Sequence, residues 1–149
     1  MIAVELARPG NNGFVHMLHD AAFGDMTIES YKQWISERNR RVYVISDRDA
    51  GTGFATAIGF AFVRLRRDAA TICKIAIIKQ FRRQGIATEA VRQIAAKHGK
   101  RLTRAAAKEP DSIAQDFFRS LGMRLKLVED KPKDRYWVFE GQNKERAKR

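Results

Sequence analysis

The fold of this chain is decided by the stretch Phe81-Arg82-Arg83-Gln84-Gly85-Ile86-Ala87. It follows the apolar run 75–78 and opens a helical pattern that continues to His98, which predicts a strand, a basic turn and a helix. The start of a helix presents free backbone N–H groups and a positive dipole end, and both attract an anion. A diphosphate suits this turn, because Gly85 permits close backbone approach and the two arginines can add charge-assisted hydrogen bonds.

The glycine spacing of this turn excludes two common phosphate-binding motifs. The chain contains no Gly-Lys-Ser/Thr sequence, which a P-loop requires. The dinucleotide fingerprint needs more glycines and an acidic residue about twenty positions later. Taken alone, the motif is also compatible with an ordinary basic turn between a strand and a helix.

Length and composition indicate one folded domain. The chain has 149 residues, of which 44% are hydrophobic and 31% charged, and these values are typical of globular rather than disordered proteins. No apolar run approaches the roughly 20 residues that cross a bilayer, and the first residues lack the pattern of a signal peptide. We therefore expect a cytoplasmic protein without a membrane partner, with a domain at 1–142 and a basic tail at 143–149.

Cysteine and histidine offer no metal site in the sequence. The single cysteine, Cys73, lies in an apolar run, where we expect a buried small side chain in a reducing compartment. His16 and His19 lie close together on a predicted helix, but no cysteine or carboxylate cluster completes a ligand set. We expect these histidines to be exposed or half-buried, and we expect no bound metal.

The chain is strongly basic, with a formal net charge of +12 and a pI near 10.3. Such a charge favours a polyanionic substrate or partner, and nucleic acid is one candidate. A surface that is basic only for solubility is the alternative. The basic residues are spread along the chain at 38–41, 64–67, 82–83, 97–104 and 144–149.

Hydrophobic periodicity predicts an alternating series of elements. Strands are expected at 2–6, 42–45, 56–65, 70–78, 102–107, 123–128 and 136–139, with a possible bulge at Gly59. Helices are expected at 14–23, at 28–35 with Thr27 as the cap, at 87–98, and from Pro110 to just before Gly122. The strand at 70–78 is apolar on both faces, which indicates a central position. The last two strands would form a hairpin around residues 131–134.

Two motifs and the element order resemble one family. The spacing Arg-x-x-Gly-x-Ala, at Arg82, Gly85 and Ala87, resembles the acyl-CoA signature of the GNAT acetyltransferases. The segment 111–123 resembles the family's Asn-x-x-Ala-x-x-Phe-Tyr-x-x-x-Gly-Phe pattern. There the matches are Ala114, Phe117, Leu121 and Gly122, whereas Asp111 replaces asparagine and Met123 replaces phenylalanine. The predicted element order is also that of the family, over nearly the whole chain.

The resemblance implies an α/β (α+β) GNAT fold, with a mixed, mostly antiparallel sheet flanked by helices. It implies acetyl-CoA as co-substrate, with the pyrophosphate on the loop and the pantetheine arm in a splay between the fourth and fifth strands. Backbone N–H groups of the fourth strand would bind the acetyl oxygen, where negative charge develops. The cofactor-binding residues implied are Ile75, Ala76, Ile77, Arg82, Arg83, Gln84, Gly85, Ile86, Ala87, Thr88, Asp111 and Phe118.

The catalytic residues are where the chain departs from the family. Phe118 stands where many members have a tyrosine that protonates the departing thiolate, and phenylalanine has no proton to give. Three interpretations stay open: water or another side chain protonates the thiolate, Tyr136 or Tyr43 replaces the tyrosine, or the domain is a poor catalyst. The strand position where some relatives place a glutamate falls near Thr71. Glu109, at the end of the fifth strand, is the best-placed acid, although an exposed loop carboxylate before a helix is the favoured interpretation of this residue.

The function predicted from the sequence is an acetyl-CoA-dependent N-acetyltransferase that moves an acetyl group directly to a primary amine. The positive charge favours an acceptor associated with nucleic acid, such as an aminoacyl-tRNA, a ribosomal protein or a DNA base. The alternative is a catalytically divergent GNAT module that binds nucleic acid or acyl-CoA without turnover. A homodimer is common in this fold, but no feature of the sequence establishes one.

Overall fold

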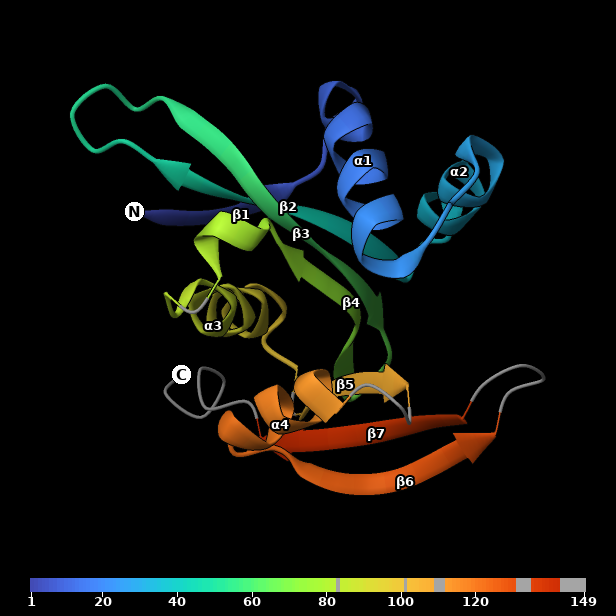
Figure 1. Ribbon diagram of the computed structural model, residues 1–149. Coiled ribbons are helices and arrows are strands. Elements are labelled where there is room, and N and C mark those ends of the chain that lie inside the picture. The colour runs from blue at the N-terminus through green and yellow to red at the C-terminus, as the bar shows by residue number, and fades with distance from the viewer. Residues whose placement is uncertain (83, 101, 109–111, 131–134, 143–149) are drawn as a thin grey trace.

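The computed structural model describes residues 1–82, 84–100, 102–108, 112–130 and 135–142 (Figure 1). The predicted element order is confirmed, although several strands extend further than predicted, and two 3-10 turns (Pro9–Asn11 and Lys79–Phe81) are added. The strands are β1 Ile2–Leu6, β2 Arg40–Arg48, β3 Ala55–Leu65, β4 Ala69–Ile77, β5 Leu102–Lys108, β6 Arg124–Asp130 and β7 Arg135–Gln142. The helices are α1 Asn12–Phe23, α2 Ile28–Ser36, α3 Ile86–His98 and α4 Ser112–Ser120.

The seven strands form one sheet in the order β1-β2-β3-β4-β5-β7-β6. Only β4 and β5 run parallel; the other neighbours are antiparallel. The sheet is therefore mixed and mostly antiparallel, as predicted. β4 has three strands on each side, which explains why it is apolar on both faces.

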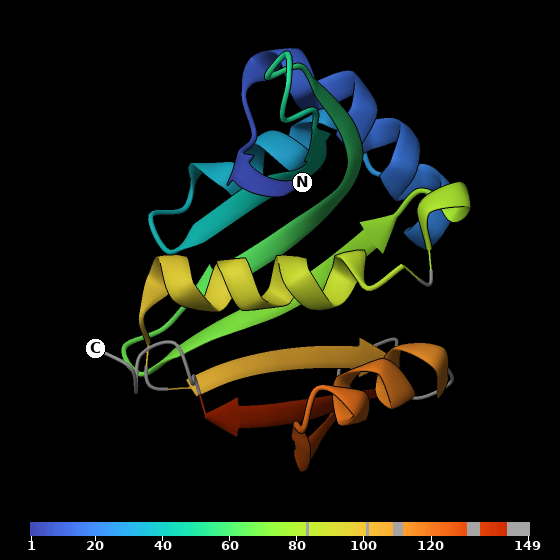
Figure 2. The same ribbon diagram turned by 90° about the vertical axis from the view of Figure 1, so that its left-hand side faces the viewer.

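Helices cover both faces of the sheet and divide the core into two clusters (Figure 1). One face carries α1 and α2, whose apolar side chains pack on alternate residues of β2 and β3. The opposite face carries α3 and α4. The alternation is clear in β3, where Phe60 and Phe62 belong to the α1/α2 cluster and Ala61 and Val63 to the α3/α4 cluster. Figure 2 shows α3 lying along the sheet, on the face opposite α1 and α2.

Local interactions fix the helices at their ends. Thr27 caps α2 as predicted, because its side chain accepts a hydrogen bond from the Ser30 backbone N–H at 3.0 Å. Gly99 ends α3 in the left-handed conformation, at φ 57°. Gln93 fastens α3 to β1: its amide donates to the Ile2 carbonyl at 2.8 Å and accepts from the Val4 N–H at 3.2 Å. No helix in the described ranges is long and apolar enough to cross a membrane.

Two bulges interrupt the central strands. The register of β2 against β3 shifts between Ile45 and Ser46, beside Gly59, and this confirms the predicted irregularity there. A side chain at Gly59 has no room, since a Cβ would lie 2.5 Å from the Ala76 carbonyl oxygen and 2.7 Å from Ile77 Cδ1. The second shift lies between Phe62 and Val63 and was not predicted.

Candidate functional site

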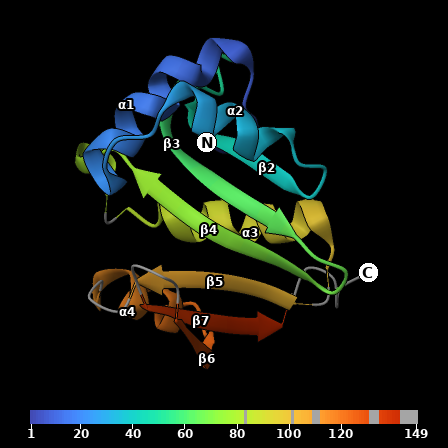
Figure 3. The same cartoon turned by 90° about the vertical axis from the view of Figure 1, so that its right-hand side faces the viewer.

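The site begins where β4 and β5 separate. The two strands pair only from Ala69↔Leu102 to Ile72↔Ala105, yet β4 continues to Ile77 and β5 continues to Lys108. In Figure 3 they meet near the β3–β4 turn and diverge toward their C-terminal ends. This is the splay that the resemblance to the GNAT acetyltransferases implies. It leaves the β5-facing edge of residues 73–77 without a strand partner in the described structure.

The bulge in β4 falls at the first residue of the splay. Phe62 pairs with Lys74 and Val63 with Ile72, so Cys73 is the extra residue. A bulge bends its strand and increases the local twist, which turns β4 away from β5. It also places Cys73 and Lys74 successively on the α1/α2 face, while Ile75 packs against the α3/α4 cluster. Cys73 is half-buried, and burial raises the pKa of its thiol.

The predicted oxygen-binding strand lies within the splay. Ile75 is half-buried, and Ala76 and Ile77 are buried. Their backbones pair with β3 on one side only, at Ala61, Phe60 and Gly59. Since antiparallel strands direct their N–H groups alternately to the two sides, part of this segment's hydrogen-bonding capacity faces the open edge. Assignment of these N–H groups to an acetyl oxygen stays a prediction.

The start of α3 provides the second part of the site. Gly85 has φ 75° and ψ 7°, a left-handed conformation that favours glycine, and no side chain caps the helix start. Its Cβ position would meet nothing within 4 Å, so the turn is open to solvent. The first N–H groups of a helix have no partner within the helix, and the dipole is positive there. Ile86 is buried and Ala87 half-buried, while Gln84, Gly85 and Thr88 are exposed.

Arg82 joins these two parts. Its Nε donates to the carbonyl of Ile77, the last residue of β4, at 2.9 Å. This bond fixes the loop to the splay and leaves the other guanidinium N–H groups on an exposed residue. Gln84 donates weakly to the Gln80 carbonyl at 3.3 Å. Arg83, Glu109 and Asp111 lie outside the described residues, so their predicted roles stay predictions.

Phe118 is a core residue on α4. It is 3% exposed and its ring lies 5.9 Å from that of Phe139 on β7 and 5.5 Å from that of Phe117. Its neighbours are therefore apolar, which fits a side chain that packs rather than transfers a proton. Its contact with the cofactor stays a prediction.

The structure separates the two candidate tyrosines. Tyr43 is 4% exposed, and its hydroxyl is hydrogen-bonded to His98 Nε2 at 2.8 Å, at the C-terminal end of α3. Tyr136 is half-buried and pairs with Lys108, the last residue of β5, at the end of the sheet where the splay opens. Alternation along β7 places Tyr136 on the face opposite Phe139, which is the α1/α2 face. Only Tyr136 lies toward the splay.

Sequence analysis missed a pair of polar side chains on the same face. Lys74 Nζ lies 2.7 Å from His19 Nε2, and His19 Nδ1 lies 2.8 Å from the Gly24 carbonyl oxygen. This geometry indicates a neutral imidazole that donates through Nδ1 and accepts from the ammonium group. Lys74 also lies 5.6 and 5.7 Å from the ring centroids of Phe23 and Phe62. A lysine thus projects at the bulge where the splay begins.

The environment of His19 explains its neutral form. Burial lowers the pKa of its imidazole, and the charge of Lys74 lowers it further. His19 is 3% exposed, so the expectation of an exposed or half-buried side chain was wrong for this residue. The helical pattern of α1 could not reveal it, because Lys74 is 55 residues away in the chain. No group of three or more possible metal ligands occurs within the described ranges.

Comparison with known proteins agrees with this geometry. The model of the acetyltransferase (GNAT) family matches residues 12–123. The chain therefore belongs to the GNAT family, and the predicted enzyme class, a GNAT-type acetyltransferase, is confirmed. A search of curated proteins finds no match.

Several solved structures share the fold at low sequence identity. A spermidine N-acetyltransferase from Vibrio cholerae, in complex with CoA and spermine, has a TM-score of 0.74 at 13% identity, covering 98% of each chain. Arabidopsis thaliana NAA60, bound to a bisubstrate analogue, has a TM-score of 0.73 at 13% identity, covering 95% of this chain and 98% of its own. The Escherichia coli ribosomal-protein-S18-alanine N-acetyltransferase has a TM-score of 0.72 at 13% identity, covering 95% and 94%. Proteins with such different acceptors share this fold, so the fold alone does not name the acceptor.

Proposed function

We propose that this protein transfers an acetyl group from acetyl-CoA directly to a primary amine. The observation that carries the proposal is the combination of an open, uncapped helix start at Gly85 with a β4–β5 splay joined to it through Arg82. The diphosphate would bind the first N–H groups of α3. The pantetheine arm would follow the open edge of β4, where a strand would otherwise pair.

The chemistry requires three events. The neutral amine attacks the thioester carbonyl carbon, the carbonyl oxygen becomes negative, and the C–S bond then breaks to release a thiolate. N–H groups among Ile75, Ala76 and Ile77 would stabilise the oxygen. The amine loses one proton and the thiolate gains one, so no other reactant is needed. Most of the rate would come from holding the two substrates together.

Tyr136 is the proton donor that we assign to the thiolate. It lies at the open end of the splay, whereas the Tyr43 hydroxyl is buried against His98. Water would carry the proton that the amine loses back to the tyrosine. Phe118 would then pack against the cofactor side of the core without taking part in proton transfer.

The acceptor that we propose is an amine on a molecule associated with nucleic acid. The chain carries a net charge of +12, and a cationic polyamine would be repelled by such a surface. Lys74, at the start of the splay, adds a positive charge on the α1/α2 face. An aminoacyl-tRNA, a ribosomal protein and a DNA base all supply an amine within a polyanionic setting.

Calorimetric titration with acetyl-CoA tests the cofactor site. Gly85→Glu introduces a carboxylate at the proposed diphosphate position, and we expect it to abolish measurable binding. Gly85→Ala is the matched control, because it carries the left-handed backbone cost of about 1 kcal/mol without the charge. Wild-type protein that does not bind acetyl-CoA would contradict the proposal. Binding without turnover on any amine would instead favour a divergent, non-catalytic module.

A further inference from the structure

The end of the sheet opposite the splay gathers basic side chains from three segments. They are the turn before β2, the β3–β4 turn and the C-terminal end of α3. We call this surface the basic end; its residues are Arg38, Arg40, Arg41, Arg64, Arg66, Arg67, Lys97 and Lys100. The segments 37–41, 64–68 and 97–100 carry eight basic and two acidic residues, a net charge of +6 and half of the chain's +12.

The strand register brings the first two segments together. Arg40 pairs with Arg64 across β2 and β3, and the Leu65 N–H donates to the Asn39 carbonyl at 2.6 Å. The third segment is held to β2, two residues beyond the first segment, by the 2.8 Å hydrogen bond between His98 and Tyr43. Burial lowers the pKa of His98, and the charges of Arg41, Lys100 and Lys97 lower it further, so Arg41 of the first segment lies close to the lysines of the third.

The arginines of the basic end differ from five of the other arginines that the structure describes, although Arg8, Arg82 and Arg124 likewise have no carboxylate partner among the described residues. These five pair with a carboxylate of the fold: Arg48 with Glu5, Arg92 with Glu89, Arg104 with Glu140, Arg119 with Asp116 and Arg135 with Asp130. Within the described ranges, no residue of the basic end has a carboxylate partner. None of the carboxylates in the described part of the chain therefore neutralises this charge by direct contact.

Part of the basic end is held in place by contacts within it. Arg41 Nη1 donates to the carbonyls of Arg38 and Arg40, at 2.7 and 2.8 Å. The guanidinium of Arg40 lies 5.3 Å from the centre of the Trp34 ring. These contacts order the guanidinium groups before any partner binds, which reduces the entropy lost on binding. The same groups keep free N–H donors for phosphate oxygens.

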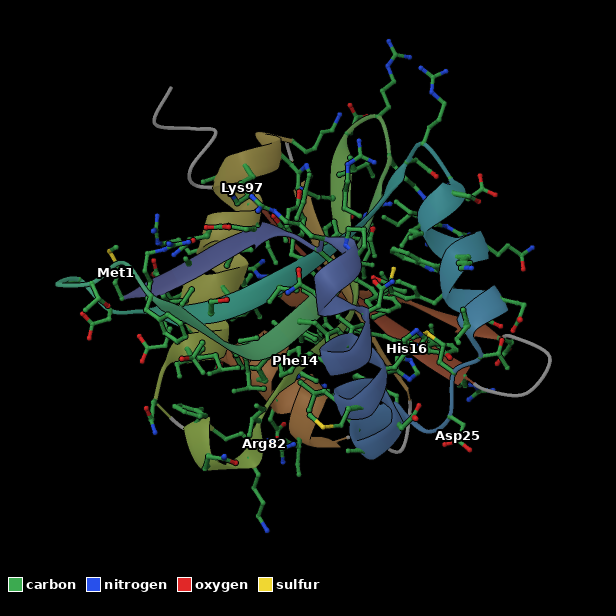
Figure 4. The ribbon with its side chains drawn as sticks, turned by 90° about the horizontal axis from the view of Figure 1, so that it is seen from above. Met1, Phe14, His16, Asp25, Arg82 and Lys97 are labelled. Atoms are coloured by element: carbon green, nitrogen blue, oxygen red, sulfur yellow. The ribbon has the colours of Figure 1, made fainter. Side chains whose placement is uncertain are left out.

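The basic end lies far from the cofactor site. Helix α3 begins at Ile86, directly after Gly85, and ends at His98; 13 residues at a rise of 1.5 Å give a length of about 20 Å. Figure 4 shows Arg82 and Lys97 on opposite sides of the molecule. The basic end thus cannot serve the diphosphate. β7 also ends here, since Gln142 pairs with Leu102 and Leu102 with Ala69 beside the β3–β4 turn.

We infer that the basic end is a docking surface for the phosphodiester backbone of a nucleic acid. Six of its eight basic residues are arginines, whose planar fork suits phosphate oxygens better than the single point charge of lysine. Three separate segments spread these charges over a surface, as a chain of phosphates requires, rather than around one anion. We expect binding at this surface to be independent of the base sequence, because phosphate contacts carry no sequence information. For the identity of the acceptor this inference rests on the proposed function, but binding itself requires no acetyl transfer.

Fluorescence anisotropy with labelled oligonucleotides tests this surface. We would titrate single-stranded RNA, single-stranded DNA and duplex DNA, each of roughly 20 nucleotides, at several salt concentrations. The test variant combines Arg66→Gln, Arg67→Gln and Lys97→Gln, all exposed at the basic end. The control variant combines Lys32→Gln, Lys79→Gln and Lys126→Gln, which are exposed elsewhere and remove the same charge. Thermal melting checks that both variants fold.

We expect wild-type protein to bind at least one of these nucleic acids with a steep salt dependence. The test variant should bind about tenfold more weakly and reduce the slope of log K against log salt by about 2 for single strands and about 3 for the duplex, because three phosphate contacts are removed. The control variant should bind as the wild type does. Equal loss in both variants would show attraction by net charge alone and overturn the inference.

Two other results would also overturn it. One is the absence of salt-sensitive binding to all three nucleic acids by the wild type. The other is equally effective competition by an acidic peptide, which would make a protein the partner. Neither result would affect acetyl-CoA binding, so a failure of this inference is distinguishable from a failure of the proposed function.

Discussion

The two ends of the sheet use the same strands and the same helix in opposite ways. At one end β4 and β5 part, α3 begins without a cap, and backbone groups face outward. At the other end β4 and β5 pair, α3 terminates at Gly99, and charged side chains face outward. The first end attracts an anion through its backbone and the second through its side chains. Half of the chain's net positive charge therefore lies away from the proposed cofactor site.

The largest effect that we expect is a difference in kcat between variants of Tyr136, at the splay, and Tyr43, near the basic end. Tyr136→Phe at the splay should lower kcat about 100-fold, because a positioned general acid contributes at least that factor. Tyr43→Phe, near the basic end, should leave kcat unchanged while removing the hydrogen bond to His98. Steady-state kinetics with a responsive amine measures both.

Full activity of Tyr136→Phe in the same assay would contradict the assignment of Tyr136 as the proton donor. Water would then be the proton source, and the splay end would act by positioning alone. A greater kcat loss for Tyr43→Phe than for Tyr136→Phe would be a stronger contradiction, because it would move the chemistry toward the basic end.

A second test concerns the close packing behind the splay. Gly59→Ala places a Cβ within 2.7 Å of both the Ala76 carbonyl oxygen and Ile77 Cδ1, so β4 must shift. We expect the free energy of unfolding to fall by about 1–3 kcal/mol, as is typical of overpacking. Gly13→Ala is the matched control, since its Cβ would meet nothing within 4 Å and alanine favours a helix. Urea denaturation compares the two; equal stabilities would show that β4 yields easily at this point.

The smallest effect is a pH dependence of stability at two histidines, one near each end. Burial lowers the pKa of both His19 and His98 below the usual value, so the unfolded state binds protons more readily. Stability is therefore complete above about pH 6.5 and falls as the pH drops below it, by at most about 1.4 kcal/mol per pH unit for each histidine. His98→Gln and His19→Gln should each lose less stability on acidification than the wild type. Denaturation midpoints that fall equally in all three proteins would contradict this.

Local sequence signals predicted most of the fold. Gly85 and the helical pattern after it determine the strand–turn–helix unit, and Thr27 marks the start of α2. The apolar residues on both faces of the strand at 70–78 predict the central position that β4 occupies. These features depend on neighbouring residues, so periodicity and capping chemistry reveal them. Strand ends were less well predicted, because charged residues such as Arg40 and Arg48 continue the pairing of β2 beyond its apolar part.

Features that depend on distant residues could not be predicted. The bulge arises because β4 has one more residue than β3 between two paired positions, and no residue type typical of a bulge occurs at Cys73. The Lys74–His19 pair joins β4 to α1 across 55 residues. The basic end likewise combines three short charged segments that look unrelated in the sequence. Register and packing, rather than local propensity, create each of these.

One calorimetric experiment tests the separation of the two ends most directly: acetyl-CoA is titrated into the wild type, into Gly85→Glu, and into the triple variant of Arg66, Arg67 and Lys97. We predict that Gly85→Glu abolishes binding and that the triple variant keeps the wild-type Kd, since Lys97 lies near the far end of a helix about 20 Å long and Arg66 and Arg67 lie in the β3–β4 turn, where β4 and β5 pair. Loss of acetyl-CoA binding in the triple variant, or its retention in Gly85→Glu, would contradict the account.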